Sequence, residues 1–407
     1  MQGKTPLSRR SFLARSGALG CSLAAAPLLT PIALAAVPGE QRLVVIILRG
    51  AMDGLDLLRP VGEAGYAAMR PSLASGEAPL ELDGFFALHP ALDQLHPLWA
   101  RGELAFAHAV STPYRDKRSH FDGQDILESG AAALNGQRDG WLNRALGELP
   151  DTRLRTGFAV GREELLILAG EVPVSHWAPD AALALTPQSQ LLLRHMYRDA
   201  PLFAASMDEA ISLTGSLEGG AMVEDYSAAR AAMMESIQGG SRNQGVAKIA
   251  RFTAEQLLGE TRIASFSING WDTHANQKRA LARALRELQS AILTLKQTLG
   301  PVWQQTTILA MTEFGRTARE NGTGGTDHGT GGAMVMAGGA INGAKVYGQW
   351  PGLGELDLYQ GRDLMATGDI RAYGGAALAG LFGLKASALE TRVFPGLDMG
   401  DAPQIIA

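Results

Sequence analysis

Two carboxylates and a histidine stand in or beside a glycine-rich stretch in the last third of the chain. Glu313 follows a short apolar run, and Asp327 and His328 lie within residues 321–332, six of which are glycine. So much glycine is unsuited to a helix or a central strand and lets backbone pack closely around a bound group. Carboxylates and imidazoles are good ligands for zinc and similar ions. We therefore predict a metal site here, with an idle, solvated loop as the alternative.

A second carboxylate and imidazole pair follows an earlier apolar run at residues 262–268. Asp272 and His274 are two apart, a spacing that puts both side chains on one side of an extended turn. Two ligands of one ion need such a common side. Asp53 comes after another apolar run, where a lone aspartate is more commonly a turn or helix-cap residue. We predict that five side chains converge in one pocket: Asp53, Asp272, His274, Glu313 and His328.

A polar loop at residues 111–122 contributes candidates for catalysis. Ser119 lies where this loop enters a helix predicted at residues 121–129, and a helix N-terminus favours anions through its free amides and its dipole. Its hydroxyl fits a nucleophile and an N-cap equally well. His120 is a candidate base or ligand. Bidentate contact with an anionic ester could come from Arg115, Arg118 or Arg316. The predicted catalytic set is Ser119, His120 and Arg316.

The candidate side chains follow apolar runs that need places in a sheet. Leucines at helical spacing between residues 281 and 299 predict a helix that joins two of these runs. The order strand, site, helix, strand, site is that of a parallel crossover sheet, whose sites gather at one edge. The predicted fold class is therefore α/β, a three-layer sandwich with a mostly parallel central sheet. Five strands are predicted from β-branched apolar composition, at residues 43–48, 103–108, 262–268, 306–311 and 334–337.

Weaker patterns predict the remaining elements. A strand is expected at residues 165–169, and residues 367–369 are expected to cap a last helix that ends at Leu381. A helical insertion is predicted near residues 200–245, where Gly, Ser, Met and Ala are frequent and periodicity is weak. Further helices are predicted at residues 88–95, 189–197 and 246–257.

The N-terminus carries a pattern typical of an export signal. Arg9 and Arg10 begin a twin-arginine motif, an apolar stretch follows at residues 17–34, and Ala35 ends a small-residue cleavage site. Prolines within the apolar stretch argue against a permanent membrane span. We predict export of the folded protein to the periplasm or beyond by the twin-arginine translocase. The predicted division is a signal peptide at residues 1–35 and a single α/β domain at residues 36–407.

Composition limits the partners of the exported chain. Loss of the leader would remove four cations and no acids, which takes the formal charge from −5 for all 407 residues to −9 for the mature chain. An acidic surface argues against nucleic acid as a partner. The one cysteine, Cys21, lies in the leader, so the mature chain has no thiol for a disulfide or for nucleophilic catalysis.

Several segments resemble a single protein family, and they lie at residues 46–54, 119–125, 271–276, 312–317 and 327–329. Together they span most of the mature chain, and they are similar to the twin-arginine-exported bacterial family catalogued as domain of unknown function 1501. Through that family the chain more distantly resembles the alkaline phosphatase and sulfatase superfamily of two-metal hydrolases.

The distant resemblance implies roles for individual residues. Asp53 would match the aspartate after the first strand, Ser119 the nucleophilic hydroxyl, and Asp272 with His274 the later ligand pair. His328 would match the last ligand. Where the superfamily has an adjacent aspartate and histidine, this chain has Glu313 followed by phenylalanine, so the second metal position is altered.

The implied activity is metal-dependent hydrolysis of a phosphate or sulfate ester, small or polymeric. One or two divalent ions are expected, with zinc the first choice. An exported binding protein without turnover, derived from that hydrolase fold, is the alternative, and Phe314 favours it because it replaces a ligand histidine. A third hypothesis is a metal-dependent hydrolase of some other substrate.

Overall fold

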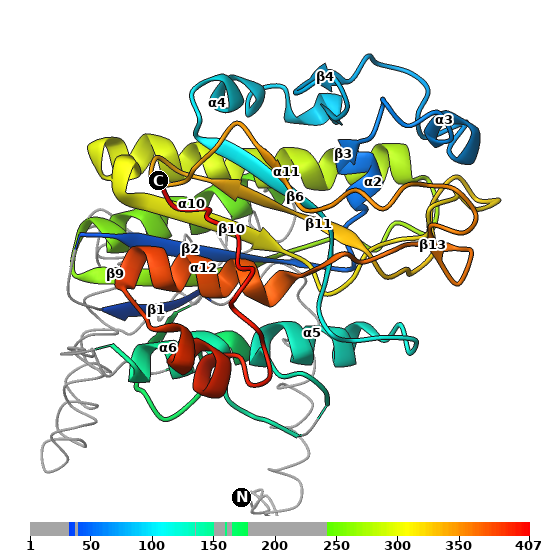
Figure 1. Ribbon diagram of the computed structural model, residues 1–407. Coiled ribbons are helices and arrows are strands. Elements are labelled where there is room, and N and C mark those ends of the chain that lie inside the picture. The colour runs from blue at the N-terminus through cyan, green and yellow to red at the C-terminus, as the bar shows by residue number, and fades with distance from the viewer. Residues whose placement is uncertain (1–31, 37–39, 135, 150–158, 161–164, 178–241) are drawn as a thin grey trace, which may run out of the picture.

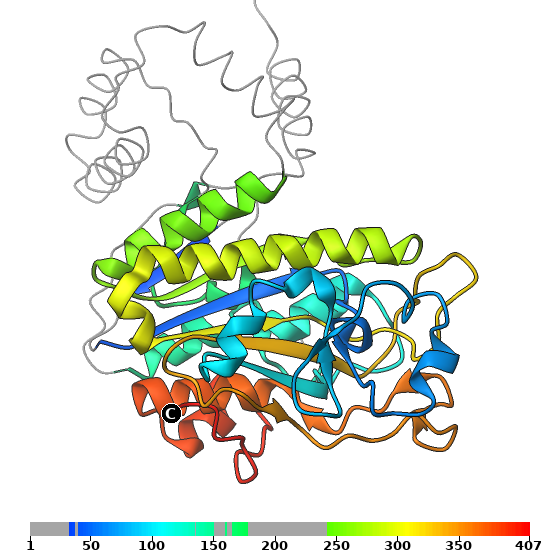
Figure 2. The ribbon, with the colours of Figure 1, turned by 90° about the horizontal axis from the view of Figure 1, so that it is seen from above.

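The computed structural model describes residues 32–36, 40–134, 136–149, 159–160, 165–177 and 242–407. Most of the predicted leader, the predicted helix at 189–197 and nearly all of the insertion near 200–245 lie outside these residues. Within them, a central sheet is covered by helices on both faces, as Figures 1 and 2 show. The predicted α/β sandwich is therefore confirmed. One face carries α10 (Arg242–Leu258) and α11 (Gln277–Leu299), and the other carries α5 (His120–Ser129), α6 (Trp141–Gly147) and α12 (Ile370–Phe382).

The central sheet is mixed, with its parallel strands at the centre. The strand β2 lies between β10 and β9 and is parallel to both. The strand β11 is antiparallel to β10 and to β6, so β6 runs in the same direction as the three parallel strands. In spatial order the sheet consists of β12 (Val346–Tyr347), β6 (Leu104–Ser111), β11 (Gly332–Ala337), β10 (Thr306–Met311), β2 (Arg42–Arg49), β9 (Thr261–Asn269), β1 (Ile32–Ala36), β8 (Ser175–Trp177) and β7 (Ala159–Val160), with β15 (Gly368–Asp369) beside β6.

Smaller elements complete the described chain (Figure 1). Beyond the end of β2, the short helix α2 (Gly54–Leu57) leads into a small sheet of β3 (Leu58–Arg59), β5 (Ala87–Leu88) and β4 (Leu80–Glu81). A two-stranded sheet pairs β13 (Leu358–Tyr359) with β14 (Asp363–Leu364). The short helices are α3 (Tyr66–Met69), η1 (Pro90–Leu92), α4 (His96–Ala100), η2 (Leu166–Leu168), η3 (Gly300–Gln305), α13 (Ala386–Ala388) and η4 (Leu389–Val393).

Burial on both faces explains the unbroken apolar run of β2. Val44 and Ile46 pack in the cluster that contains the apolar faces of α10 and α11. Leu43 and Val45 point the other way and pack with residues of α6 and α12. A strand covered on both faces needs apolar side chains at successive positions, since its alternate residues enter different cores. The leucine stripe of α11 is buried along its length, as its spacing predicts.

The predicted strand at residues 165–169 is wrong. Leu166–Leu168 forms a single 3-10 turn, and the N–H of Ile167 donates to a carboxylate oxygen of Glu128 at 3.2 Å. The carbonyl of Ala169 accepts from the N–H of Gly140 at 2.8 Å. The run is buried, as its composition requires. These two backbone hydrogen bonds, however, go to the Glu128 side chain and to the N–H of Gly140, not to a neighbouring strand. Composition alone does not distinguish such a turn from a strand.

The predicted helix at residues 88–95 is confirmed only as one 3-10 turn, Pro90–Leu92. Leu88 ends β5 and pairs with Leu58 of β3. His89 is extended, with φ −57° and ψ 135°, and one turn of 3-10 helix follows it. Proline at the next position, Pro90, disfavours helical backbone in the residue before it. A new helix, α4, then begins at His96.

The position of β1 bears on the predicted leader. Ile32–Ala36 pairs with both β8 and β9 in the sheet, so the predicted cleavage site at Ala35 falls inside a strand. Among the helices in the described part of the chain, none combines the length and apolarity needed to cross a membrane.

Candidate metal centre

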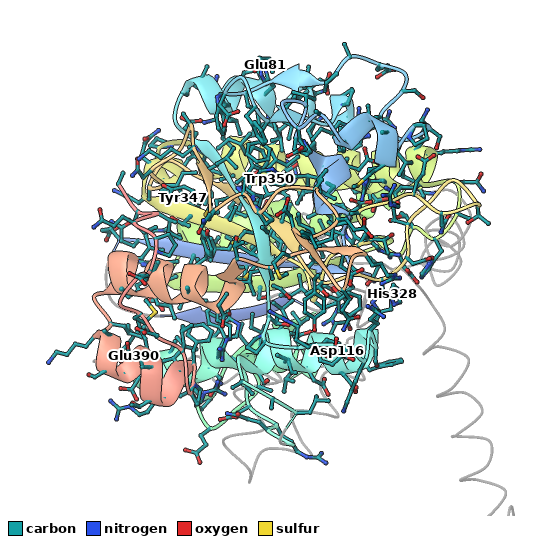
Figure 3. All side chains as sticks on the ribbon, turned by 45° about the vertical axis from the view of Figure 1, so that its right-hand side comes forward. Glu81, Asp116, His328, Tyr347, Trp350 and Glu390 are labelled. Carbon is teal, nitrogen blue, oxygen red and sulfur yellow. The ribbon has the colours of Figure 1, made fainter. Side chains whose placement is uncertain are left out.

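The candidate site lies where the parallel strands end. The loop after β9 carries Asp272 and His274, and Glu313 is the second residue after the end of β10. The loop after β6 ends at His120, the first residue of α5. His328 lies four residues before β11, whose start is at the same edge because β11 is antiparallel. Figure 3 shows His328 at this end of the sheet. Sheet topology thus gathers segments that are far apart in sequence, as a parallel sheet is expected to do.

Three donor atoms form a small triangle at this edge. Nε2 of His274 lies 3.0 Å from Oδ1 of Asp272 and 3.0 Å from Nε2 of His328. Nε2 of His328 lies 3.2 Å from the same Asp272 oxygen. Ligands about 2.0–2.1 Å from one zinc ion are separated by about 2.9–3.3 Å, depending on the angle between them. The three separations fall in this range.

His120 brings a third imidazole to the same place. Its Nε2 lies 3.5 Å from Oδ2 of Asp272, and the donor atoms of His120, Asp272 and His328 all lie within 4.8 Å of one another, so these three residues can hold a metal ion. Nε2 of His120 is buried and has no hydrogen-bond partner. A buried nitrogen without a partner is costly unless something binds it, and a metal ion at this position would do so.

Each of the three imidazoles is oriented through its other nitrogen. Nδ1 of His120 contacts a carboxylate oxygen of Glu313 at 2.8 Å, and Nδ1 of His328 contacts the carbonyl of Arg118 at 3.0 Å. Nδ1 of His274 lies 3.2 Å from a carboxylate oxygen of Asp327. Carboxylates and carbonyls only accept hydrogen bonds, so Nδ1 must carry the proton. In the neutral rings, the lone pairs of all three Nε2 atoms then face the centre, as metal-binding histidines require.

The carboxylates of the site have pKa values below their usual range. Burial raises the pKa of Glu313, but hydrogen bonds from His120, Gln124 and Thr312 more than offset this and lower it. Burial likewise opposes ionisation of Asp272, and Arg316 outweighs it, so the pKa of Asp272 is lowered. Both groups are therefore carboxylates at neutral pH.

The imidazoles differ in their surroundings. The hydrogen bond with Glu313 raises the pKa of His120 against the opposing effect of burial. Burial lowers the pKa of His328, with smaller contributions from Arg316 and His120. Phe314 packs beside both rings, with centroid separations of 5.2 Å to His120 and 5.3 Å to His328. The phenylalanine thus contacts two of the three imidazoles, at the position where the distant superfamily resemblance implied a ligand.

Arg316 fixes Asp272 rather than projecting into solvent. The guanidinium is fully buried, and one of its nitrogens donates to Oδ1 of Asp272 at 2.5 Å. It also donates to the carbonyls of Gly50, Ala51 and Thr326. With its donors committed to the protein, Arg316 is placed to position Asp272, whereas the sequence suggested direct contact with a substrate.

Strained backbone surrounds the same site. Ala51, Arg118 and Asn276 have φ values of 56°, 53° and 50°, in the left-handed region that residues other than glycine seldom adopt. The carbonyl of Ala51 accepts from Arg316, and that of Arg118 accepts from His328. Such strain persists only where surrounding contacts impose it and is concentrated at functional sites.

The structure does not bring Asp53 to the imidazoles. Asp53 is fully buried, and one guanidinium nitrogen of Arg70 contacts its two oxygens at 2.9 and 2.8 Å. Gln277 also donates to it, and the hydroxyl oxygen of Thr326 lies 3.1 Å from its Oδ2. Burial raises the pKa of Asp53, but Arg70 outweighs burial and the pKa is lowered. The alternative, a structural aspartate at a helix cap, matches its contact with the N–H of Asp56 at the start of α2.

The other candidates have mixed placements. Ser119 is the N-cap of α5, where its hydroxyl accepts from the N–H of Asp122 at 3.4 Å. Glu313 and Asp327 contact the outer nitrogens of His120 and His274, so they orient imidazoles and do not face the centre. Sequence reasoning missed Gln124, whose amide donates to Glu313 at 3.2 Å. Its position four residues after His120 on α5 was the available signal, since that spacing shares a helix face.

Comparison with known proteins identifies a family whose description assigns no function. The family model described as "Protein of unknown function (DUF1501)" matches residues 81–374. No curated protein matches the chain. No solved structure matches it either.

Proposed function

Because the chain belongs to the DUF1501 family, whose description assigns no activity, we propose its function from the site itself: a metal-dependent hydrolase of a phosphate or sulfate ester. The observation that carries the proposal is the convergence of three imidazole Nε2 atoms on Asp272, each ring held by an acceptor at Nδ1. Imidazole nitrogens with one carboxylate favour zinc over magnesium or calcium, which take oxygen ligands.

We propose one ion per chain. A second ion would need further free carboxylate oxygens near the first, and the three other acids named from the sequence have partners within the protein. Oδ1 of Asp327 accepts from Asn321 and contacts His274. Both oxygens of Asp53 contact Arg70. Oε1 of Glu313 accepts from Gly50 and Gln124 as well as contacting His120, and Oε2 accepts from Thr312. The proposed ligands are therefore His120, Asp272, His274 and His328.

The residues around the centre suit an ester substrate. A bound divalent ion would supply Lewis acidity and make a hydroxyl or water more nucleophilic near neutral pH. Arg316 holds Asp272 in place, and Glu313 holds His120. The side chains of Asp272 and His274 are 47 % and 45 % exposed, so the centre is open to a small ester or to one carried on a polymer.

A non-catalytic binding protein is the second candidate. Phe314 contacts His120 and His328 and fills the position where the distant superfamily has a ligand. A site that has lost one ligand in this way can retain an ion for a structural purpose. Turnover distinguishes the two candidates, because both predict bound metal.

The test is metal analysis of the purified mature protein followed by assays with aryl phosphates and aryl sulfates. We expect about one equivalent of zinc per chain and metal-dependent hydrolysis of one ester class. A protein that binds no divalent ion contradicts both candidates. Stoichiometric metal without hydrolysis of either ester favours the binding protein.

Ser119→Ala tests the proposed nucleophile once an active ester is found. We expect at least a 100-fold fall in kcat with metal content unchanged, because a helix N-terminus can stabilise charge developing beside an attacking hydroxyl. Ser129→Ala, at the other end of α5, is the matched control. Normal turnover with a loss of about 1 kcal/mol in the free energy of unfolding would identify Ser119 as an N-cap alone.

We also propose export by the twin-arginine pathway, on the strength of Arg9, Arg10 and the apolar stretch after them. Replacing both arginines with lysine should retain the precursor in the cytoplasm, which cell fractionation would measure. Unchanged export would contradict the proposal. Mass spectrometry of the exported chain should locate cleavage near Ala35. Cleavage there would remove most of β1 from its pairing with β8 and β9, whereas a terminus before Ile32 would preserve that strand.

A further inference from the structure

A buried glutamine connects the loops that carry the proposed ligands. Gln277 is the first residue of α11 and is fully buried. Its side-chain oxygen accepts from the hydroxyls of Thr273 at 3.0 Å and Thr326 at 2.7 Å. Its side-chain nitrogen donates to Asp53 at 2.7 Å and to Asp56 at 3.1 Å. Both ends of one amide are thus used in full.

The two threonines lie close to the proposed ligands in sequence. Thr273 lies between Asp272 and His274, and Thr326 lies two residues before His328. A backbone hydrogen bond from Thr326 N–H to the Thr273 carbonyl, 3.2 Å long, runs alongside. The amide oxygen of Gln277 therefore fixes the distance between the segment that carries Asp272 and His274 and the segment that carries His328.

The opposite end of the amide anchors this link to the sheet. Asp53 and Asp56 lie just beyond the end of β2, and each contacts a buried arginine, Arg70 and Arg59 respectively. These two ion pairs have little freedom because their side chains are almost completely buried. The strand end is thereby connected through Gln277 to both ligand loops.

We propose that Gln277 is a positioning residue for the metal centre, which it serves by holding the Asp272–His274 segment and the His328 segment in register. This inference rests on the proposed metal site. Gln277 does not touch the centre, and its effect reaches the ligands through Thr273 and Thr326. Substitution of groups that orient ligands commonly weakens metal binding by about 10- to 100-fold.

The experiment compares Gln277→Met with Gln289→Met in the metal-free full-length protein reloaded with Co²⁺. Gln289 is the matched control because it lies on the same helix, is buried, and uses both ends of its amide, accepting from Gln94 and Leu95 and donating to Asp93. Both variants lose buried hydrogen bonds. Chelator competition gives the Co²⁺ affinity, the visible spectrum reports ligand geometry, and thermal unfolding reports stability.

We expect Q277M to bind Co²⁺ about 10-fold or more weakly with an altered visible spectrum, while Q289M keeps the wild-type affinity and spectrum. Wild-type affinity and spectrum in Q277M would overturn the inference and leave the proposed function standing. A wild-type protein that binds no Co²⁺ or Zn²⁺ would overturn the proposed function itself.

A milder pair covers the case in which Q277M does not fold. Thr273→Val removes a single hydroxyl that donates to Gln277, and Thr253→Val removes an equally buried hydroxyl on α10 that donates to the Ile249 carbonyl. Weaker Co²⁺ binding in T273V than in T253V, by about threefold or more, would support the positioning role. Equal affinities in the two variants would overturn it.

Discussion

Replacing His328 with alanine is expected to remove the metal ion, with zinc content falling from about one equivalent to near zero and affinity falling more than about 100-fold. The Nε2 atom of His328 contacts both His274 and Asp272, so its loss deletes one corner of the donor triangle. A water molecule in place of the imidazole would bind zinc more weakly, since zinc prefers nitrogen and sulfur ligands. Hydrolysis of any ester found to be a substrate should fall with the metal.

The control for this variant is His96→Ala on α4, where the imidazole contacts the carbonyl of Glu81 away from the centre. It should retain wild-type zinc content. Dialysis against a chelator followed by elemental analysis measures both variants under one condition. Full zinc content and wild-type affinity in H328A would contradict the assignment of His328, and equal losses in H96A would show that the loss reflects general destabilisation.

The sheet was predictable because its strands carry an unusually plain signal. β2 and β10 are buried on both faces, so apolar residues follow one another without alternation at 43–48 and 308–311, and turn residues follow each run. Parallel connection then places the following loops at one edge. The spacing of Asp272 and His274 indicated a common side for both, and their donor atoms are 3.0 Å apart. These features depend on the local pattern of apolar residues and on the order of strands and helices along the chain. Both can be read from the sequence.

The roles of the acids were not predictable in the same way. Glu313 and Asp272 both follow strands, but only Asp272 faces the imidazole Nε2 atoms, whereas Glu313 lies behind His120. That difference depends on which backbone and side-chain donors reach each oxygen. The left-handed backbone of Arg118, which aims its carbonyl at His328, likewise has no signal in sequence because arginine seldom adopts it.

The Asp53 interpretation failed to anticipate a partner. Arg70 follows the short helix α3, 17 residues from Asp53, with no motif linking the two. Resemblance to two-metal hydrolases favoured a ligand at Asp53, while the buried guanidinium gives the carboxylate a neutralising partner within the protein. A carboxylate after a strand therefore has at least two uses, and only its partners distinguish them.

Arg70→Met is expected to lower the free energy of unfolding by about 3–5 kcal/mol, because removing one partner of a buried ion pair leaves the other charge uncompensated. Arg70 is fully buried, and it also donates to the carbonyls of Thr317 and Ala318 at 2.7 and 2.9 Å. Chemical denaturation measures the change. Arg101→Met is the control, since Arg101 pairs with Glu103 at the surface and such pairs contribute about 1 kcal/mol or less.

Adding Asp53→Asn to Arg70→Met should recover a substantial part of the loss, because the double variant no longer buries an unpaired carboxylate. Added zinc should not raise the stability of R70M more than that of the double variant, since Asp53 lies outside the proposed ligand set. The opposite result is informative: if R70M binds a second zinc ion per chain and regains stability on doing so, the guanidinium occupies what is otherwise a metal position, and Asp53 is a ligand after all. A loss below about 1 kcal/mol in R70M would contradict the view that this buried pair stabilises the fold.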